Sequence, residues 1–286
     1  MLLNHRSLHP ALGVAIEGVD LRSELDAATL SQIQRTFYEN GVVLFRGQSL
    51  TESDHVRFAR RIGELEIHFL KQYLHPQHPE LLILSNVIEN GKPIGAMGAG
   101  QYWHTDLSYA AAPCFASILR SVKAPVESGV VLGDTLFASM FAAYDALPAT
   151  MQKRLAGLKA AHRYGDRFKK TVANGAVRAP LTKDQRAVPD AVHPVIRTHP
   201  VTGRKCIYVN EGFTDHIVGL PADESRSLLD ELFAHATRPG FIYRHKWQEG
   251  DLLMWDNVST QHNAIGDYGT RPRIMQKTTV AGSIPF

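Results

Sequence analysis

The sequence predicts a mainly β protein, a β-sandwich or jelly roll with α-helices packed on its outside. Short runs rich in β-branched and aromatic residues, separated by turn residues, dominate the C-terminal third: KCIYVN (205–210), GFIYRHKW (240–247), GDLLMWDN (250–257) and RIMQKTTVAG (273–282). The regular alternation of strands and helices that a parallel α/β sheet requires is missing. Because the chain shows neither an internal repeat nor a linker, we expect one domain over residues 1–286.

Two amphipathic helices are predicted near the N-terminus. The first covers residues 26–41, where apolar residues recur every three or four positions and the pattern stops at Gly41. The second covers residues 53–65 and opens with Thr51–Asp54, which resembles a capping box. Between them, VVLFRG (42–47) is typical of a short buried strand.

The middle of the chain mixes both kinds of element. ELLILSNVI (80–88) and FASILRSV (115–122) predict strands, and the glycine-rich segment 90–101 between them predicts a mobile loop. Segments 138–158 and 223–237 have helical periodicity and look like insertions into the β structure.

Composition and charge exclude several classes of protein. The hydrophobic fraction of 44% allows a sizeable core, so disorder is not expected. Lys plus Arg number 31 against 28 for Asp plus Glu, and a net charge of +3 this evenly spread argues against nucleic-acid binding. The basic, proline-containing segment 168–192 predicts a long exposed loop or lid whose charges form a solvated face.

The sequence predicts a cytoplasmic protein without a membrane span. Cys114 and Cys206 are far apart and have no C-x-x-C spacing, which favours two core residues in a reducing compartment. His5, Arg6 and Pro10 interrupt the apolar stretch that a signal peptide needs. No run approaches the ~18 apolar residues of a membrane helix.

A candidate metal site begins at WHTDLSY (103–109). On an extended chain, residues two apart point to the same side, so His104 and Asp106 could bind one ion. His262, the last residue of GDLLMWDNVSTQH, is the candidate third ligand, expected near another strand end. Two histidines and one carboxylate leave three positions open on an octahedral Fe(II), whereas a structural zinc would prefer four N and S ligands.

The last predicted strand adds two cations. Alternation in RIMQKTT places Arg273 and Lys277 on one face, and they point into the interior if that face is the inner one. A buried cation is costly unless an anion pairs with it, so such an interior is expected to hold carboxylate- or sulfonate-like groups. The alternative is a reversed strand whose cations face water.

Four ordered motifs then carry a resemblance. W-H-T-D at 103–106, G-D-T at 133–135, W-D-N-x-x-T-Q-H at 255–262 and R-I-M at 273–275 resemble the taurine dioxygenase and 2,4-dichlorophenoxyacetate dioxygenase family of Fe(II)- and 2-oxoglutarate-dependent oxygenases. The similarity covers nearly the whole chain, from GVVLFRGQSL (41–50) to the last strand. It implies a double-stranded β-helix (jelly-roll) core with flanking α-helices, and Fe(II), 2-oxoglutarate and O2 as cofactor and co-substrates.

The resemblance also implies roles for individual residues. His104, Asp106 and His262 would be the iron ligands, and Thr135 and Arg273 would hold the distal carboxylate of 2-oxoglutarate. The implied reaction hydroxylates a C–H bond and releases succinate and carbon dioxide.

The substrate-side residues are implied in the same way. Where the two namesake enzymes carry an arginine that binds the substrate anion, this chain has Lys277, which keeps the charge but loses the bidentate fork. His68 falls where the taurine enzyme has a histidine that contacts sulfonate, although a buried structural histidine is the alternative. Tyr102, Leu107 and Phe213 are candidates for shaping the pocket. We expect a small anionic organic substrate and, since the family commonly self-associates, a homo-oligomer.

Two other functions stay open from the sequence. A metallohydrolase could hold Zn²⁺ with the same triad and activate water, which consumption of 2-oxoglutarate would distinguish. A non-catalytic jelly-roll module that binds an anionic small molecule would leave His104 and Asp106 as turn residues and would not bind iron.

Overall fold

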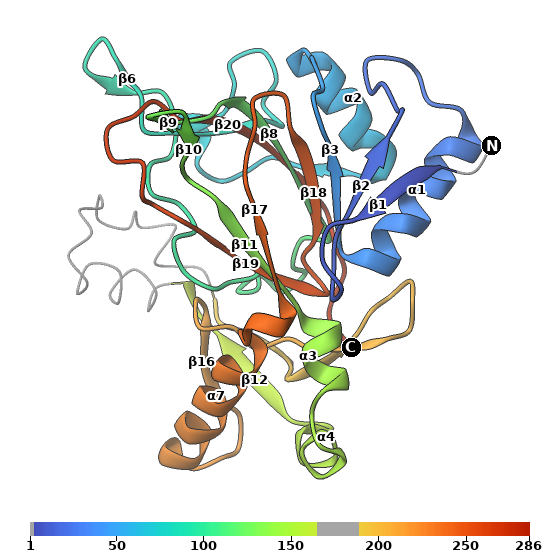
Figure 1. The fold of residues 1–286 in the computed structure, drawn as a ribbon. Coiled ribbons are helices and arrows are strands. Elements are labelled where there is room, and N and C mark those ends of the chain that lie inside the picture. The colour runs from blue at the N-terminus through green and yellow to red at the C-terminus, as the bar shows by residue number, and fades with distance from the viewer. Residues whose placement is uncertain (1–2, 165–188) are drawn as a thin grey trace.

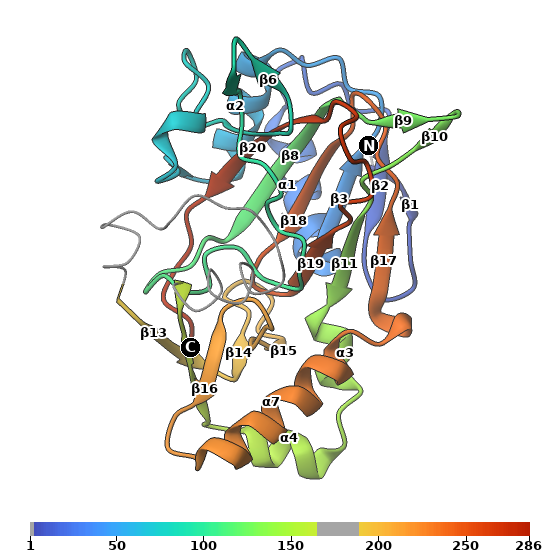
Figure 2. The ribbon, with the colours of Figure 1, turned by 90° about the vertical axis from the view of Figure 1, so that its left-hand side faces the viewer.

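The computed structural model describes residues 3–164 and 189–286. The chain is strand-rich, with helices on the outside of the main sheet and a helical region at one end (Figures 1 and 2). Of the helices in the described residues, none is long and apolar enough to cross a membrane. Cys114 and Cys206 are both free and buried, as predicted for core residues.

The largest sheet has eight strands in the order β1-β2-β3-β18-β8-β20-β4, with β5 also paired to β20. Its pairs are antiparallel except for β2 and β3. The strands are β1 (Asn4–Ser7), β2 (Val14–Glu17), β3 (Val42–Phe45), β4 (Leu65–Glu66), β5 (Leu82–Ser85), β8 (Ala116–Lys123), β18 (Leu252–Asp256) and β20 (Ile274–Val280).

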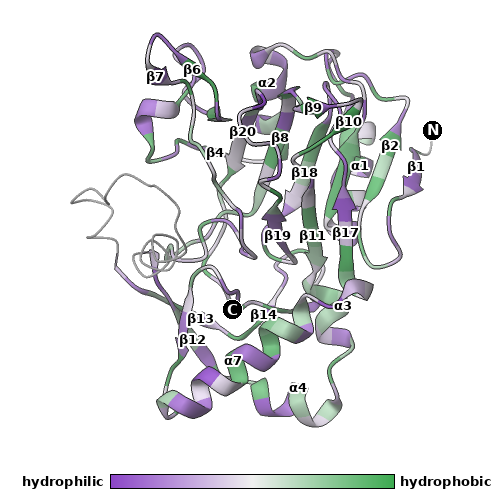
Figure 3. Cartoon of the chain, turned by 60° about the vertical axis from the view of Figure 1, so that its left-hand side comes forward, coloured by the Kyte–Doolittle hydropathy of each residue, from purple (hydrophilic) through white to green (hydrophobic). Residues whose placement is uncertain are grey.

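A three-stranded sheet lies opposite the large sheet. It has the order β17-β11-β19, from β11 (Thr135–Ser139), β17 (Ile242–His245) and β19 (Thr260–Ala264). Phe137 and Tyr243 of this sheet share one buried cluster with Leu253, Trp255 and other residues of the large sheet. Hydrophobic residues follow strands such as β2, β11 and β18 (Figure 3). The two sheets therefore enclose a common core.

Helices α1 (Ala27–Asn40) and α2 (Glu52–Ile62) cover the outer face of the large sheet (Figure 1). Asp26 caps α1, and Gly41 ends it with φ of 69°, a left-handed conformation that glycine adopts without strain. Thr51 and Asp54 form the predicted capping box of α2. Both predicted helices are thus confirmed to within a few residues.

The second half of the chain adds a region below the two sheets, with a core of its own that includes Leu228, Leu229 and Leu232 (Figure 1). The helices in the predicted insertions are α3 (Met140–Asp145), α4 (Ala149–Leu155) and α7 (Ala222–Ala236). The strands of this region are β12 (Lys159–His162), β13 (Ala191–Pro194), β14 (Ile196–Thr198), β15 (Lys205–Ile207) and β16 (Thr214–Ile217).

The smaller elements of the chain are η1 (Lys71–Tyr73), β6 (Ile88–Glu89), β7 (Lys92–Pro93), β9 (Val126–Glu127), β10 (Val130–Val131) and η2 (Pro239–Phe241).

Three predictions for individual segments need correction or remain open. The predicted strand 80–88 is two short strands, β5 and β6, with a break between them. The predicted loop 90–101 starts inside the β6–β7 hairpin, whose turn holds Asn90 and Gly91 at positive φ. Most of the predicted lid 168–192 lies outside the described residues, but its last two positions belong to β13.

Candidate active site

A pocket opens between the two sheets and contains every residue that the sequence nominates for the site. Thr135, from the three-stranded sheet, and Lys277, from the large sheet, both line it. The described lining residues are His68, Phe69, Leu70, Leu82, Leu84, Ala96, Ala99, Gly100, Tyr102, His104, Asp106, Leu107, Tyr109, Leu119, Thr135, Tyr164, Phe213, Trp255, His262, Ala264, Arg273 and Lys277.

Backbone pairing brings His104 and His262 together. His104 N donates to the His262 carbonyl at 3.1 Å, and His262 N donates to the His104 carbonyl at 2.8 Å, so the two residues form an isolated antiparallel bridge. Their ring centroids are 4.1 Å apart. His262 is the third residue of β19, so the prediction that it lies near a strand end was wrong: the polar sequence TQHNA forms a strand paired with β11.

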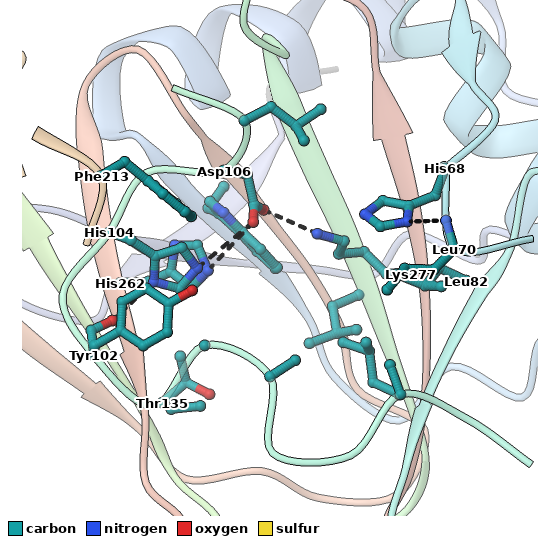
Figure 4. A pocket seen from close by; sticks show the side chains of 18 of the residues that line it. His68, Leu70, Leu82, Tyr102, His104, Asp106, Thr135, Phe213, His262 and Lys277 are labelled. Carbon is teal, nitrogen blue, oxygen red and sulfur yellow. Dashed lines mark hydrogen bonds and ion pairs between the residues drawn. The ribbon is translucent and has the colours of Figure 1, made fainter. Parts of the chain in front are cut away.

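Asp106 completes the cluster from the turn that follows His104. Its Oδ1 atom lies 3.7 Å from Nε2 of His104 and 4.0 Å from Nε2 of His262 (Figure 4). One donor atom from each residue lies within 4.8 Å of the others, and all three residues are buried. The chain continues through Leu107 at a φ of 54°, a left-handed position that turns it away.

The protonation states suit a divalent metal ion. His104 donates from Nδ1 to the Tyr102 carbonyl at 2.8 Å, which leaves Nε2 as the ring nitrogen that faces Oδ1 of Asp106. Burial and the neighbouring His104 hold the pKa of His262 well below its ordinary value, so that ring is neutral. Burial raises the pKa of Asp106, but the Lys277 ammonium and the two imidazoles lower it more, and the net pKa is well below the usual range.

The G-D-T motif builds the other side of the pocket. Gly133, at a φ of 76°, lets the side chains of Arg273 and Tyr268 come so close that a Cβ would lie 3.2 Å from Nε of Arg273. Asp134 is buried and accepts from Nε of Arg244 at 2.6 Å. Thr135 faces the pocket as the first residue of β11.

Arg273 is a buried cation whose charge is unmatched within the described residues. It is 8% exposed, its guanidinium lies 5.5 Å from the Tyr268 ring centroid, and no carboxylate of the described residues forms an ion pair with it. Burial lowers its pKa from the ordinary value, a sign of a poorly solvated charge. The Thr135 hydroxyl, which accepts from Trp247 Nε1 at 3.0 Å, lines the same pocket. A carboxylate of an organic co-substrate fits this pair.

Lys277 and His68 lie on the side of Asp106 that faces away from the two histidines (Figure 4). The Lys277 ammonium donates to Oδ2 of Asp106 at 3.1 Å, so the residue expected to bind substrate already pairs with a candidate metal ligand. His68 accepts from the Leu70 amide through Nδ1 at 3.1 Å, which places the ring proton on Nε2. Burial, with a smaller effect of Lys277, lowers the pKa of His68 to about 4, so His68 is a neutral donor at pH 7.

The structure also identifies residues that sequence reasoning missed. Ser117 donates to Oδ2 of Asp106 at 2.7 Å, and Asn257 donates to Ser117 at 3.0 Å. Asn257 belongs to the W-D-N motif, so its place in that motif could have identified it. Ser117 is a single serine in a strand, and the sequence around it gives no such signal. Tyr102, Leu107 and Phe213 line the pocket as expected.

Comparison with known proteins decides the family. Residues 4–279 match the family described as taurine catabolism dioxygenase TauD, TfdA family. The chain belongs to this family. It is 36% identical over 289 residues to the alpha-ketoglutarate-dependent 2,4-dichlorophenoxyacetate dioxygenase of Cupriavidus pinatubonensis, with 97% of each chain covered. It is 33% identical over 287 residues to the alpha-ketoglutarate-dependent sulfate ester dioxygenase of Pseudomonas putida, which covers 97% of this chain and 90% of that protein.

A solved structure resembles the TauD/TfdA family chain over almost its full length. The crystal structure of AAD-2 in complex with Mn(II) and N-oxalylglycine has a TM-score of 0.81 and 29% identity, and the match covers 99% of each chain. Family membership and the triad confirm the predicted enzyme class, a 2-oxoglutarate-dependent non-haem iron dioxygenase that uses Fe(II), 2-oxoglutarate and O2. They favour it over both the hydrolase and the non-catalytic module.

Proposed function

We propose that the enzyme hydroxylates a C–H bond of a small anionic substrate, such as a sulfonate, a sulfate ester or an aryloxyalkanoate or other carboxylate, with release of succinate and CO2. The observation that carries the proposal is the convergence of His104, Asp106 and His262 on one point of a pocket that two cations, Arg273 and Lys277, also line. The pocket can therefore hold two anionic groups beside the metal site, one at each cation.

In this proposal five pocket residues bind the metal ion and the co-substrate. His104, Asp106 and His262 hold Fe(II), because two imidazoles and one carboxylate form a face that leaves coordination positions open. Arg273 and Thr135 bind the distal carboxylate of 2-oxoglutarate. Bound iron supplies the oxidising chemistry, and the chain supplies binding, orientation and the exclusion of water.

The remaining lining favours an anion with an apolar body. Lys277 is paired across the sheet with Leu82 and Leu119, and the lining of the pocket also includes the aromatic residues Tyr109 and Phe213. Among the described lining residues, Asp106 is the only carboxylate, and it already pairs with Lys277. A substrate that carries an ammonium group would find no counter-ion there, and burying an unpaired ammonium is costly.

We also infer that the two facing sheets belong to a double-stranded β-helix (jelly roll), in a single domain over residues 1–286. The full-length match to a structure of this enzyme type supports this inference. A cytoplasmic location, self-association and the lack of nucleic-acid binding stay predictions from the sequence.

A substrate panel tests the function. Purified enzyme with Fe(II), 2-oxoglutarate and O2 is incubated with alkanesulfonates, alkyl sulfates and aryloxyalkanoates, and succinate is measured together with the oxidised product. We expect at least one anion to raise succinate formation well above the rate without substrate, in equal amount to the product. Cleavage of a sulfate ester without consumption of 2-oxoglutarate would instead establish a hydrolase.

A further inference from the structure

The two oxygens of the Asp106 carboxylate have different surroundings. Oδ1 faces the two imidazoles, at 3.7 Å from His104 Nε2 and 4.0 Å from His262 Nε2. Oδ2 accepts a hydrogen bond from the Ser117 hydroxyl at 2.7 Å and another from the Lys277 ammonium at 3.1 Å. One oxygen is thus free to bind a metal, while the other is held from behind by two donors.

The Ser117 donor belongs to a fixed network. Asn257 donates to the Ser117 hydroxyl at 3.0 Å, and its Oδ1 accepts from the Asp106 amide at 3.3 Å and from Trp255 Nε1 at 3.1 Å. Ser117 and Asn257 are both 0% exposed, and neither lines the pocket. A molecule that binds in the pocket therefore cannot take this donor away from Asp106.

The Lys277 ammonium, in contrast, can be reached by a molecule in the pocket. Lys277 lines the pocket, and its ammonium lies between Asp106 and His68 (Figure 4). An ammonium has three N–H donors, and a single hydrogen bond from this one, the bond to Asp106, is found among the described residues. An oxyanion in the pocket would compete with Asp106 for this ammonium and would also accept a hydrogen bond from the Nε2–H of His68.

We propose that Lys277 is a shared cation, which supports Oδ2 of Asp106 while the pocket is empty and turns to the anionic group of the substrate when it binds, so that Ser117 alone then holds Asp106. The proposal rests on the proposed function, because it takes Asp106 as a ligand of Fe(II). Ser117 is then a positioning residue, which acts through Asp106 and does not touch the substrate. Binding of the substrate is thereby transmitted to the metal site.

This arrangement predicts that the importance of Ser117 depends on the state of the pocket. With the pocket empty, Lys277 still holds Oδ2 after the Ser117 hydroxyl is removed, so the metal site changes little. With an anion bound, removal of Ser117 leaves Oδ2 without a donor, and removing such a support of a metal ligand typically costs about 10- to 100-fold in affinity. Two donors on one oxygen are expected to act non-additively.

The test measures the Co(II) dissociation constant of wild-type enzyme and of Ser117→Ala in the presence of 2-oxoglutarate, with and without saturating 1-butanesulfonate. In each condition the constant of Ser117→Ala is divided by that of the wild type. The direct effect of the sulfonate charge on Co(II) is common to both proteins and cancels in this ratio. We expect a ratio of about 3 without the sulfonate and of at least about 10 with it. In a Lys277→Met background, the ratio should be at least about 10 in both conditions.

Equal ratios with and without the sulfonate, while calorimetry shows that it binds, would overturn the shared cation. Lack of any sulfonate binding to the wild type would overturn it too, because the ammonium would then not be available to an oxyanion. Ser117→Cys, which keeps the volume with a weaker donor, gives the same comparison if Ser117→Ala does not fold. Co(II) binding that is unaffected by His104→Ala and His262→Ala would instead contradict the proposed metal site.

Discussion

Arg273 and Lys277 lie on the same side of the last strand, but their surroundings differ. Arg273 is 8% exposed and forms no ion pair with the acids of the described residues, whereas Lys277 is 3.1 Å from the Asp106 carboxylate. A buried cation without an internal partner requires an anion from outside, and one with an internal partner can do without. In our proposal the Arg273 side therefore binds the co-substrate that every turnover needs, and the Lys277 side binds a ligand that must compete with Asp106.

Removing Asp106 should have the largest effect, since it takes away both a proposed metal ligand and the partner of Lys277. We expect Asp106→Ala to lower Co(II) affinity by at least about 100-fold and to abolish succinate formation. Calorimetry and a succinate assay measure the two effects. His216→Ala is the control, because His216 is half-exposed, pairs with Asp215 and lies outside the pocket. An active, metal-loaded Asp106→Ala enzyme would show that the ligand assignment is wrong.

Arg273→Met should weaken binding of 2-oxoglutarate to the Co(II) enzyme by about 100-fold, because a buried charged hydrogen-bond partner is lost. Titration calorimetry gives the constant directly. Arg271→Met is the matched control: Arg271 lies two residues away, pairs with Glu127 and does not line the pocket. Similar losses in the two variants would mean that Arg273 acts through general charge and not through contact.

Lys277 should matter for binding of the substrate anion but not of 2-oxoglutarate, which is the sharpest contrast between the two cations. Lys277→Met is expected to weaken 1-butanesulfonate binding by about 30-fold and Lys277→Arg by no more than about 3-fold, with 2-oxoglutarate binding nearly unchanged in both. Lys123→Met, at the exposed end of the neighbouring strand, serves as control. Equal losses of 1-butanesulfonate and 2-oxoglutarate binding would show that Lys277 and Arg273 do not serve different ligands.

An ammonium group on the ligand tests the apolar surroundings of Lys277. We expect 3-amino-1-propanesulfonate to bind at least about 10-fold more weakly than 1-butanesulfonate, which has similar length and the same headgroup, because the pocket offers the ammonium no free carboxylate. Competition calorimetry compares the two. Equal affinities would show that residues beyond the described lining supply a counter-ion.

The smallest effect concerns pH. Burial lowers the pKa of His68 to about 4, so lowering the pH from 8 to 6 leaves this ring neutral and adds no positive charge beside Lys277. Binding of 1-butanesulfonate should therefore change by less than about 2-fold over this range. An ordinary histidine, with a pKa near 6.5, would strengthen binding as it gains its proton toward pH 6. If binding does strengthen toward pH 6, and if this increase disappears in His68→Gln, the assignment of His68 as a neutral hydrogen-bond donor is wrong.

Much of the site could be predicted from the sequence because the chemistry lies in short motifs. His104 and Asp106 are two residues apart, and helix ends such as Thr51–Asp54 are local patterns that the structure confirms. The meeting of His104 with His262 was expected, both from the polar segment that follows the apolar strand at 250–257 and from the resemblance. That His262 lies inside a strand was not, because its strand TQHNA is polar and takes its place through pairing with β11.

The partners of the site residues could not be predicted. Lys277 and Asp106 are separated by 171 positions, and only the register of β20 against β8 places the ammonium on the metal side of the pocket. Ser117 looks like any buried hydroxyl in the sequence, since its role depends on the orientation of the Asp106 carboxylate. Such contacts follow from tertiary packing and have no local signal.

The central claim is that three side chains and Arg273 assemble one centre for Fe(II) and 2-oxoglutarate. The most direct measurement is anaerobic addition of both to the enzyme, followed by absorption spectroscopy of the visible charge-transfer band of the complex. We predict that the band forms in the wild type and in Arg271→Met, is absent in His262→Ala, and requires far more 2-oxoglutarate in Arg273→Met. A full band in His262→Ala, or none in the wild type, would contradict the account.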